Sequence, residues 1–146
     1  MRRVLALIAS LCLAAVLTAS ALAGDGRLSF TTGNFVVTCT STGQFCKPGK
    51  KLTFTLPRRG TLTSVIYTTA KTHCSAIRVF VLRNGSTVAK LPRLDAGDAT
   101  ASVHPGLGLH KGATTLRFRA KGFTGGCNAG QLGSWGGKMT VKVRLD

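Results

Sequence analysis

Catalytic chemistry needs positioned acids, bases or nucleophiles, and this chain carries few of them. It contains four Asp and no Glu, and two of the four, Asp25 and Asp146, lie far from the middle of the sequence. Asp95 and Asp98 remain as a carboxylate pair for glycoside hydrolysis. Their oxygen atoms are also of the type that binds Ca²⁺, but three-residue spacing within a Gly-containing turn favours an Asx turn instead.

Histidine and serine give no catalytic pattern either. The three histidines are His73, His104 and His110, and no Gly-x-Ser-x-Gly turn surrounds a serine. His73 precedes Cys74, yet no Cys-x-x-Cys or His-x3-His spacing completes a zinc site. We therefore expect a non-enzymatic protein without metal or cofactor, and a small hydrolase is only a third hypothesis. Its candidate nucleophiles would be Ser64, Ser75, Ser102 and Ser134.

Two segments near the end of the sequence alternate between apolar and cationic residues, as strands with one buried face do. If both strands lie in one sheet, their outward side chains form a single cationic face. Like charges directly opposite each other destabilise a sheet, so such a face favours a staggered register or a bound anion. The predicted ligand-binding cations are Arg117, Arg119, Lys121, Lys138, Lys142 and Arg144.

A Gly-rich loop is predicted between these two strands, over residues 122–137. It contains the only Trp of the chain, Trp135, among glycines that allow a ligand or other backbone to approach closely. A flat aromatic ring there can stack on a sugar or a base, and Phe123 is its best partner in such a site. The alternative is that Trp135 folds inward and caps the core. Tyr67 and Phe123 face the same choice.

The first residues predict a secretory signal peptide, with cleavage after Ala23. Arg2 and Arg3 precede an apolar run over residues 4–16, and small residues follow. No later stretch approaches the roughly 20 apolar residues of a membrane-spanning helix, so no span is expected. We expect a protein secreted to the periplasm or the extracellular space.

Charge gives the strongest indication of a partner. The whole chain has a net charge of +16; without Arg2 and Arg3, 18 Lys and Arg remain against 4 Asp, which gives +14 (18 minus 4). Such a field attracts anionic polymers, among them anionic glycans, cell-wall phosphate polymers and lipopolysaccharide. Nucleic acid is disfavoured because no nucleic-acid fold signature occurs and aromatic residues are sparse beside the cations. The alternative is a solubilising charge without a dedicated partner.

Four cysteines remain after removal of the signal peptide, and an even number in an exported protein predicts two disulfides. Three pairings are possible. We favour Cys39–Cys46, which closes a short turn over residues 41–44, together with Cys74–Cys127, which ties the Gly-rich loop to a central strand.

The rest of the chain consists of short β-patterns separated by Gly, Pro and Asn turns, and no helical period is sustained. Asn84-Gly85 predicts a tight hairpin, and residues 104–108 are expected to be a loop. We predict an all-β fold in which residues 24–146 form a single antiparallel β-sandwich, jelly-roll or Ig-like, with about eight strands. The expected strands lie at 28–30, 34–40, 51–56, 61–69, 76–82, 86–91, 100–103, 115–121 and 138–145.

The nine residues His110-Lys111-Gly112-Ala113-Thr114-Thr115-Leu116-Arg117-Phe118 resemble the late strands of secreted carbohydrate-binding sandwiches. This resemblance covers a small part of the chain; it implies a sandwich and says little about the ligand. The first hypothesis is therefore a module that binds an anionic polymer or glycan at the cell surface through the cationic face and the Trp135 loop. The second is a protein-interaction or inhibitor module that inserts loop 122–137 into a partner.

Overall fold

The computed structural model describes residues 26–70, 75–124 and 134–146. All regular structure in these ranges is β-strand, as the alternating sequence pattern predicts. No helix within them is long and apolar enough to cross a membrane. The ten strands are β1 (Arg27–Thr31), β2 (Phe35–Thr38), β3 (Lys50–Leu56), β4 (Gly60–Thr69), β5 (Ile77–Arg83), β6 (Ser86–Lys90), β7 (Thr100–Val103), β8 (Leu107–Leu109), β9 (Gly112–Gly122) and β10 (Ser134–Leu145).

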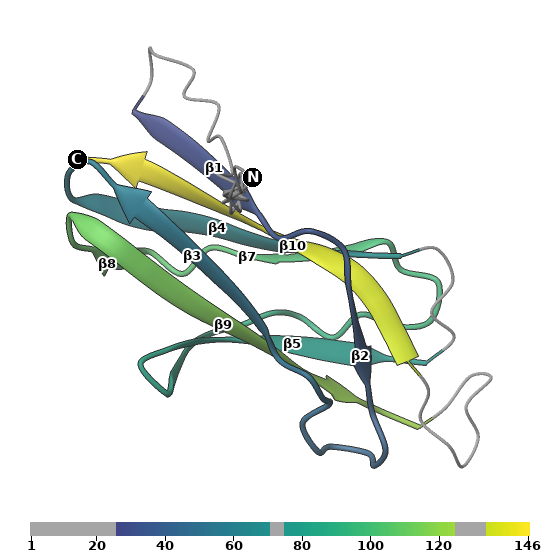
Figure 1. The fold of residues 1–146 in the computed structure, drawn as a ribbon. Coiled ribbons are helices and arrows are strands. Elements are labelled where there is room, and N and C mark those ends of the chain that lie inside the picture. Colours follow the sequence, from purple (N-terminus) through teal and green to yellow (C-terminus); the bar gives the residue numbers. More distant parts are fainter. Residues whose placement is uncertain (1–25, 71–74, 125–133) are drawn as a thin grey trace, which may run out of the picture.

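The strands form two packed antiparallel sheets (Figure 1). Sheet A has the order β1-β10-β4-β7, with β2 also paired to β10 and β8 also paired to β4. Sheet B has the order β3-β9-β5-β6. The protein is therefore an antiparallel β-sandwich, which confirms the predicted fold class.

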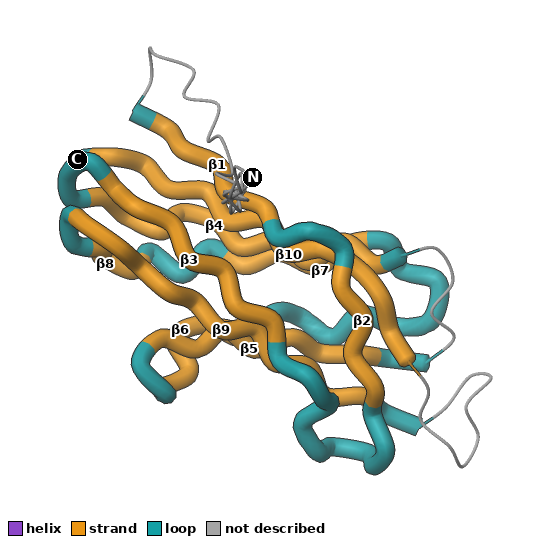
Figure 2. The backbone as a smooth tube through the Cα atoms, in the orientation of Figure 1, coloured by secondary structure: helices purple, strands orange, loops and turns teal. Residues whose placement is uncertain are grey.

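Each edge of sheet A is one strand position divided into two segments. β1 pairs with the second half of β10 and β2 with its first half, and the loop between them is visible in Figure 2. β7 and β8 divide the opposite edge along β4 in the same way. When each divided edge counts once, the eight positions have the order of a jelly roll, which decides between the two predicted sandwich types.

The nine predicted ranges match nine of the ten strands of the described residues, and the strand that was not predicted is β8. The predicted loop at residues 104–108 is wrong in its second half, because β8 begins at Leu107. β8 is only three residues long and follows Gly106, whose φ is 61°. A segment so short, next to Pro105 and Gly106, has no alternation long enough to be recognised as a strand.

The core lies between the sheets and follows the predicted alternation. In β9, Leu116, Phe118 and Ala120 are buried, while the outward positions between them carry cations. β4 lies inside sheet A, between β10 and the edge formed by β7 and β8. At the edge, Phe30 of β1 stacks on Phe54 of β3 with ring centroids 4.3 Å apart, so one aromatic pair joins the two sheets.

The predicted hairpin and one predicted disulfide are confirmed. Asn84 and Gly85 connect β5 to β6, with φ values of 51° and 84°, as a tight hairpin turn requires. Cys39 and Cys46 form a disulfide across the predicted turn, and both residues are buried. The other predicted pair, Cys74–Cys127, lies outside the described residues.

Candidate functional site

The six predicted cations do not share one face, because β9 and β10 belong to different sheets. Arg117, Arg119 and Lys121 project from the outer side of sheet B. The other three, Lys138, Lys142 and Arg144, are exposed on the outer side of sheet A. The premise that both strands lie in one sheet is therefore wrong. Sequence alternation gives the face of each strand but not the sheet in which the strand lies.

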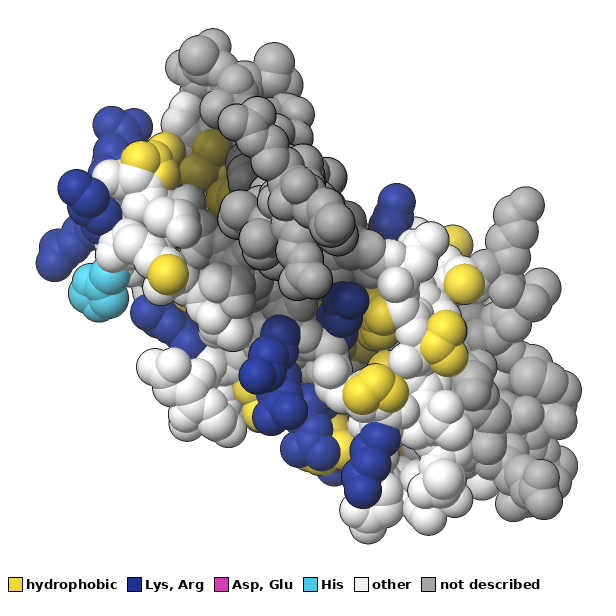
Figure 3. Space-filling model, viewed as in Figure 1, with side chains coloured by type: hydrophobic (Ala, Val, Ile, Leu, Met, Phe, Trp, Pro, Cys, Tyr) yellow, Lys and Arg dark blue, Asp and Glu magenta, His cyan; other side chains and the backbone are white. Residues whose placement is uncertain are grey.

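Sheet B nevertheless collects six cations on its own outer side, which we call the sheet B face. Strand pairing sets Lys51 opposite Arg117 and Arg78 opposite Lys121. Lys90 lies opposite Phe80, which in turn lies opposite Arg119. The space-filling view shows Lys and Arg gathered over this layer (Figure 3). The cations of the sheet B face are Lys51, Arg78, Lys90, Arg117, Arg119 and Lys121.

Two aromatic rings lie among these cations. Phe45, from the disulfide loop, meets Phe80 of β5 edge to face, with centroids 5.4 Å apart. The Arg119 guanidinium lies 3.9 Å from the Phe45 centroid, and the Lys121 ammonium lies 4.7 Å from it. Cation–π attraction holds these charges close to the protein surface. Because the rings carry no net charge, the contacts orient the cations without neutralising them.

The electrostatics of the sheet B face favour an anion. None of its four strands contains Asp or Glu, and the salt bridge found in the described part of the chain, Arg93–Asp95 at 2.8 Å, involves none of its cations. Two like-charged pairs stand directly opposite each other, which destabilises the sheet. Arg78 adds a buried Nε that has no hydrogen-bond partner among the described residues. A bound anion would relieve the repulsion between the opposed cations.

Trp135 is not part of any ligand surface. Its side chain is 2% exposed, and its Nε1–H donates to the Ser75 carbonyl at 3.1 Å. The predicted loop is also wrong over residues 134–137, which begin β10, whereas residues 125–133 lie outside the described ranges. The alternative in which Trp135 folds inward is confirmed. Phe123, the predicted partner of Trp135, is half-buried, and the Arg93 guanidinium lies over its ring, 4.9 Å from the ring centroid.

Two glycines of this region, Gly122 and Gly137, pack directly against buried aromatic rings of the core. A Cβ at Gly122 would lie 2.8 Å from Cη2 of Trp135, and a Cβ at Gly137 would lie 2.7 Å from Cε2 of Tyr67. Tyr67 is also buried, and its hydroxyl donates to the Gly136 carbonyl at 3.0 Å. Burial raises the pKa of Tyr67 from 10.0 to about 12. Close packing within the core thus accounts for glycines that suggested a binding loop.

Three of the remaining candidates for catalysis, Asp95, Asp98 and His104, make contacts within the fold. The Asp95 N–H donates to the Asp98 carboxylate at 2.8 Å, and the Asp98 N–H donates to the Asp95 carbonyl at 3.1 Å. These bonds close a turn over Asp95–Asp98, but neither is the bond of an Asx turn, in which the carboxylate accepts from the N–H two residues further on. The His104 Nδ1 is 3.0 Å from the Thr63 carbonyl. Among the described residues, no three of His, Cys, Asp or Glu come together as metal ligands. His73 and Cys74 lie outside these residues.

Sequence reasoning missed five residues of the sheet B face, and three of them had a usable signal. Arg78 and Phe80 alternate with the buried Ile77, Val79 and Val81, so a single Arg in a strand apolar on both sides indicated an outer face covered by long side chains. Lys51 shows a similar alternation. Phe45 gave no signal, because it reaches the face only through an isolated bridge with Lys121. Lys90 joins through the hairpin register.

No protein-family model matches the sequence, and no curated protein matches it. Three solved structures are distantly similar. The infectious bursal disease virus VP2 subviral particle is 14% identical, with 94% of this chain and 37% of that chain covered at a TM-score of 0.43. The catalytic domain of a GH87 alpha-1,3-glucanase in complex with nigerose is 11% identical, with 84% of this chain and 29% of that chain covered at a TM-score of 0.43. A Podospora anserina GH26-CBM35 beta-(1,4)-mannanase is 15% identical, with 84% of this chain and 29% of that chain covered at a TM-score of 0.40. The chain thus spans less than two fifths of the length of these three structures.

Proposed function

We propose that this protein is a non-enzymatic binding module for anionic polymers, including anionic glycans, and that the sheet B face is its binding surface. The observation that carries the proposal is the set of six cations on one side of four strands that contain no acidic residue. An extended polyanion can cross all four strands and place a negative group between each pair of opposed cations. Discrete charges arranged in this way favour affinity over fine discrimination among ligands.

The two aromatic rings support a ligand that carries more than charge. Phe80 is half-buried, and the ammonium groups of Lys121 and Lys90 lie 5.6 Å and 6.0 Å from its ring centroid. When these groups turn toward an anion, the ring edge becomes available to an apolar part of the ligand. A sugar chain with charged substituents offers both kinds of surface.

We also propose that the protein acts outside the cytoplasm. The predicted signal segment over residues 1–23 and the disulfide between Cys39 and Cys46 support this proposal, because such bonds persist in oxidising compartments. Surface polymers with phosphate, sulfate or carboxylate groups would be available there.

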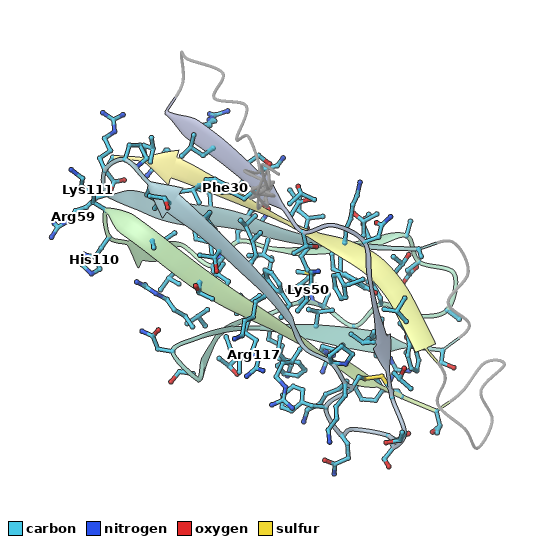
Figure 4. All side chains as sticks on the ribbon, viewed as in Figure 1. Phe30, Lys50, Arg59, His110, Lys111 and Arg117 are labelled. Atoms are coloured by element: carbon cyan, nitrogen blue, oxygen red, sulfur yellow. A yellow bond between two sulfur atoms is a disulfide. The ribbon has the colours of Figure 1, made fainter. Side chains whose placement is uncertain are left out.

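A pair of matched double variants tests the proposed surface. Lys51→Gln with Arg117→Gln removes two opposed, exposed cations from the sheet B face. The control, Arg59→Gln with Lys111→Gln, also removes one Arg and one Lys, but from the end of the sandwich, where Figure 4 shows both residues. An exposed ion pair contributes up to about 1 kcal/mol, so we expect the first variant to bind heparin roughly 3- to 30-fold more weakly.

The control should bind heparin nearly as well as the parent protein, because at moderate salt the attraction exerted by the two removed charges extends only about 10 Å. Equal weakening of both variants would mean that net charge alone attracts heparin and would refute the assigned surface. Retention of neutral dextran at high salt would refute the anionic class of ligand.

A further inference from the structure

The outer side of sheet A carries a hollow lined by cations, separate from the sheet B face. This hollow, which we call the sheet A groove, has a volume of about 460 Å³ and crosses β1, β10 and β4. Pockets of this size accept small ligands. Figure 1 shows β1, β10 and β4 in the layer opposite β3, β9 and β5, so the groove faces away from the sheet B face. Its lining residues are Arg27, Leu28, Ser29, Thr63, Ser64, His104, Lys142, Val143 and Arg144.

Three cations of the groove come from two neighbouring strands. Arg27 stands directly opposite Arg144 in the pairing of β1 with β10, and Lys142 lies two residues before Arg144 on the same side. Within the described residues, Lys142 and Arg144 make no ion pair. The nearby Asp146 carboxylate accepts from the Thr61 hydroxyl at 3.5 Å. An anion in the groove would be attracted by the exposed charges of Lys142 and Arg144.

Short hydroxyl side chains explain the depth of the groove and supply donors. Ser64 is opposite Lys142 and is only 7% exposed, so a small side chain forms the floor between long neighbours. The register shifts between Lys142 and Val143, and Thr63 fills the irregularity by donating its hydroxyl to the Lys142 carbonyl at 3.1 Å. His104, 3.0 Å from the Thr63 carbonyl, forms the far wall.

We propose that the sheet A groove is a second binding site, specific for a tetrahedral oxyanion, sulfate or phosphate, either free or carried on a sugar. Lys142 and Arg144 would neutralise the anion, and the hydroxyls of Ser29 and Ser64 would donate to its oxygens. If the sheet B face also binds polyanions, as proposed above, sites on opposite faces make the molecule bivalent. The protein would then cross-link anionic polymers.

The groove is tested directly with inorganic sulfate. When sulfate is titrated, the amide NMR signals of Ser29, Ser64 and His104 should shift. The variant Lys142→Gln with Arg144→Gln should bind sulfate roughly fivefold or more weakly than the parent protein. Lys51→Gln with Arg117→Gln is the matched control and should leave these shifts unchanged. Tighter binding of glucosamine 6-sulfate than of sulfate assigns the site to a sugar-borne anion, and equal binding assigns it to the free ion. Unchanged sulfate shifts in the groove variant would overturn the site.

Bivalency is tested by turbidity with long heparin chains. The parent protein should give a maximum at an intermediate ratio of heparin to protein, because excess heparin occupies the two faces with separate chains. The groove variant should still bind heparin but lose this maximum. If it keeps the maximum, cross-linking does not require the groove and bivalency is refuted. One combination of results separates the two proposals. If sulfate shifts the groove signals while Lys51→Gln with Arg117→Gln binds heparin as well as the parent protein, the groove site is supported and only the proposed function is refuted.

Discussion

Tyr67 provides a quantitative test of the core because it is the only Tyr of the chain. Burial raises its pKa from 10.0 in the unfolded chain to about 12 in the folded protein. Between these values the unfolded state loses its proton first, so stability present below about pH 10 falls as the pH rises toward 12. One pKa unit corresponds to about 1.4 kcal/mol, so the loss near pH 11 is about 1.4 kcal/mol.

Comparison with Tyr67→Phe isolates this effect from the titration of the lysines. Near neutral pH the variant lacks the hydrogen bond to the Gly136 carbonyl and should be less stable by about 1 kcal/mol. The two proteins should become equally stable near pH 11, as measured by urea unfolding. The tyrosinate absorbance of the folded protein gives the pKa directly. Ionisation at the ordinary value of 10, or a stability difference that does not change with pH, would refute the buried placement.

Three further predictions concern the core and the disulfide. The single Trp135 should show blue-shifted fluorescence that acrylamide quenches poorly and heparin leaves unchanged; a large change with heparin would contradict its burial. Gly122→Ala forces a methyl group against the Trp135 ring and should lower the free energy of unfolding by about 1 to 3 kcal/mol. Gly33→Ala is the matched control, because no atom lies within 4 Å of an added Cβ and its φ is not positive. Cys39→Ser with Cys46→Ser opens a short loop and should cost about 2.5 kcal/mol in chemical unfolding; an unchanged midpoint would mean that the bond does not constrain the unfolded chain.

Local features of the fold were predictable because they depend on neighbouring residues. Alternation placed Leu116 and Phe118 in the core, and Asn84-Gly85 marked a hairpin, since both rest on backbone geometry over a few residues. Strand order depends on contacts between residues far apart in the sequence. This is why β9 and β10, adjacent in the chain, were expected to share a face although they occupy different sheets.

The candidate site was predictable only in part for the same reason. Arg117, Arg119 and Lys121 were identified from one strand, but their partners Arg78 and Phe45 come from segments more than 30 residues away. Trp135 misled because a lone aromatic among glycines suits both a ligand loop and a tight core contact. The burial of Trp135, its hydrogen bond to the Ser75 carbonyl and the position of Gly122 against its ring distinguish the two.

The most direct test of the central claim is the salt dependence of heparin binding. Each cation that contacts a polyanion releases counterions, so a plot of log affinity against log salt should be steep for the parent protein. Removal of Lys51 and Arg117 should reduce the slope by roughly one to two, whereas removal of Arg59 and Lys111 should leave it unchanged. A slope near zero in the parent protein, or the same slope in all three proteins, would contradict a polyanion site on the sheet B face.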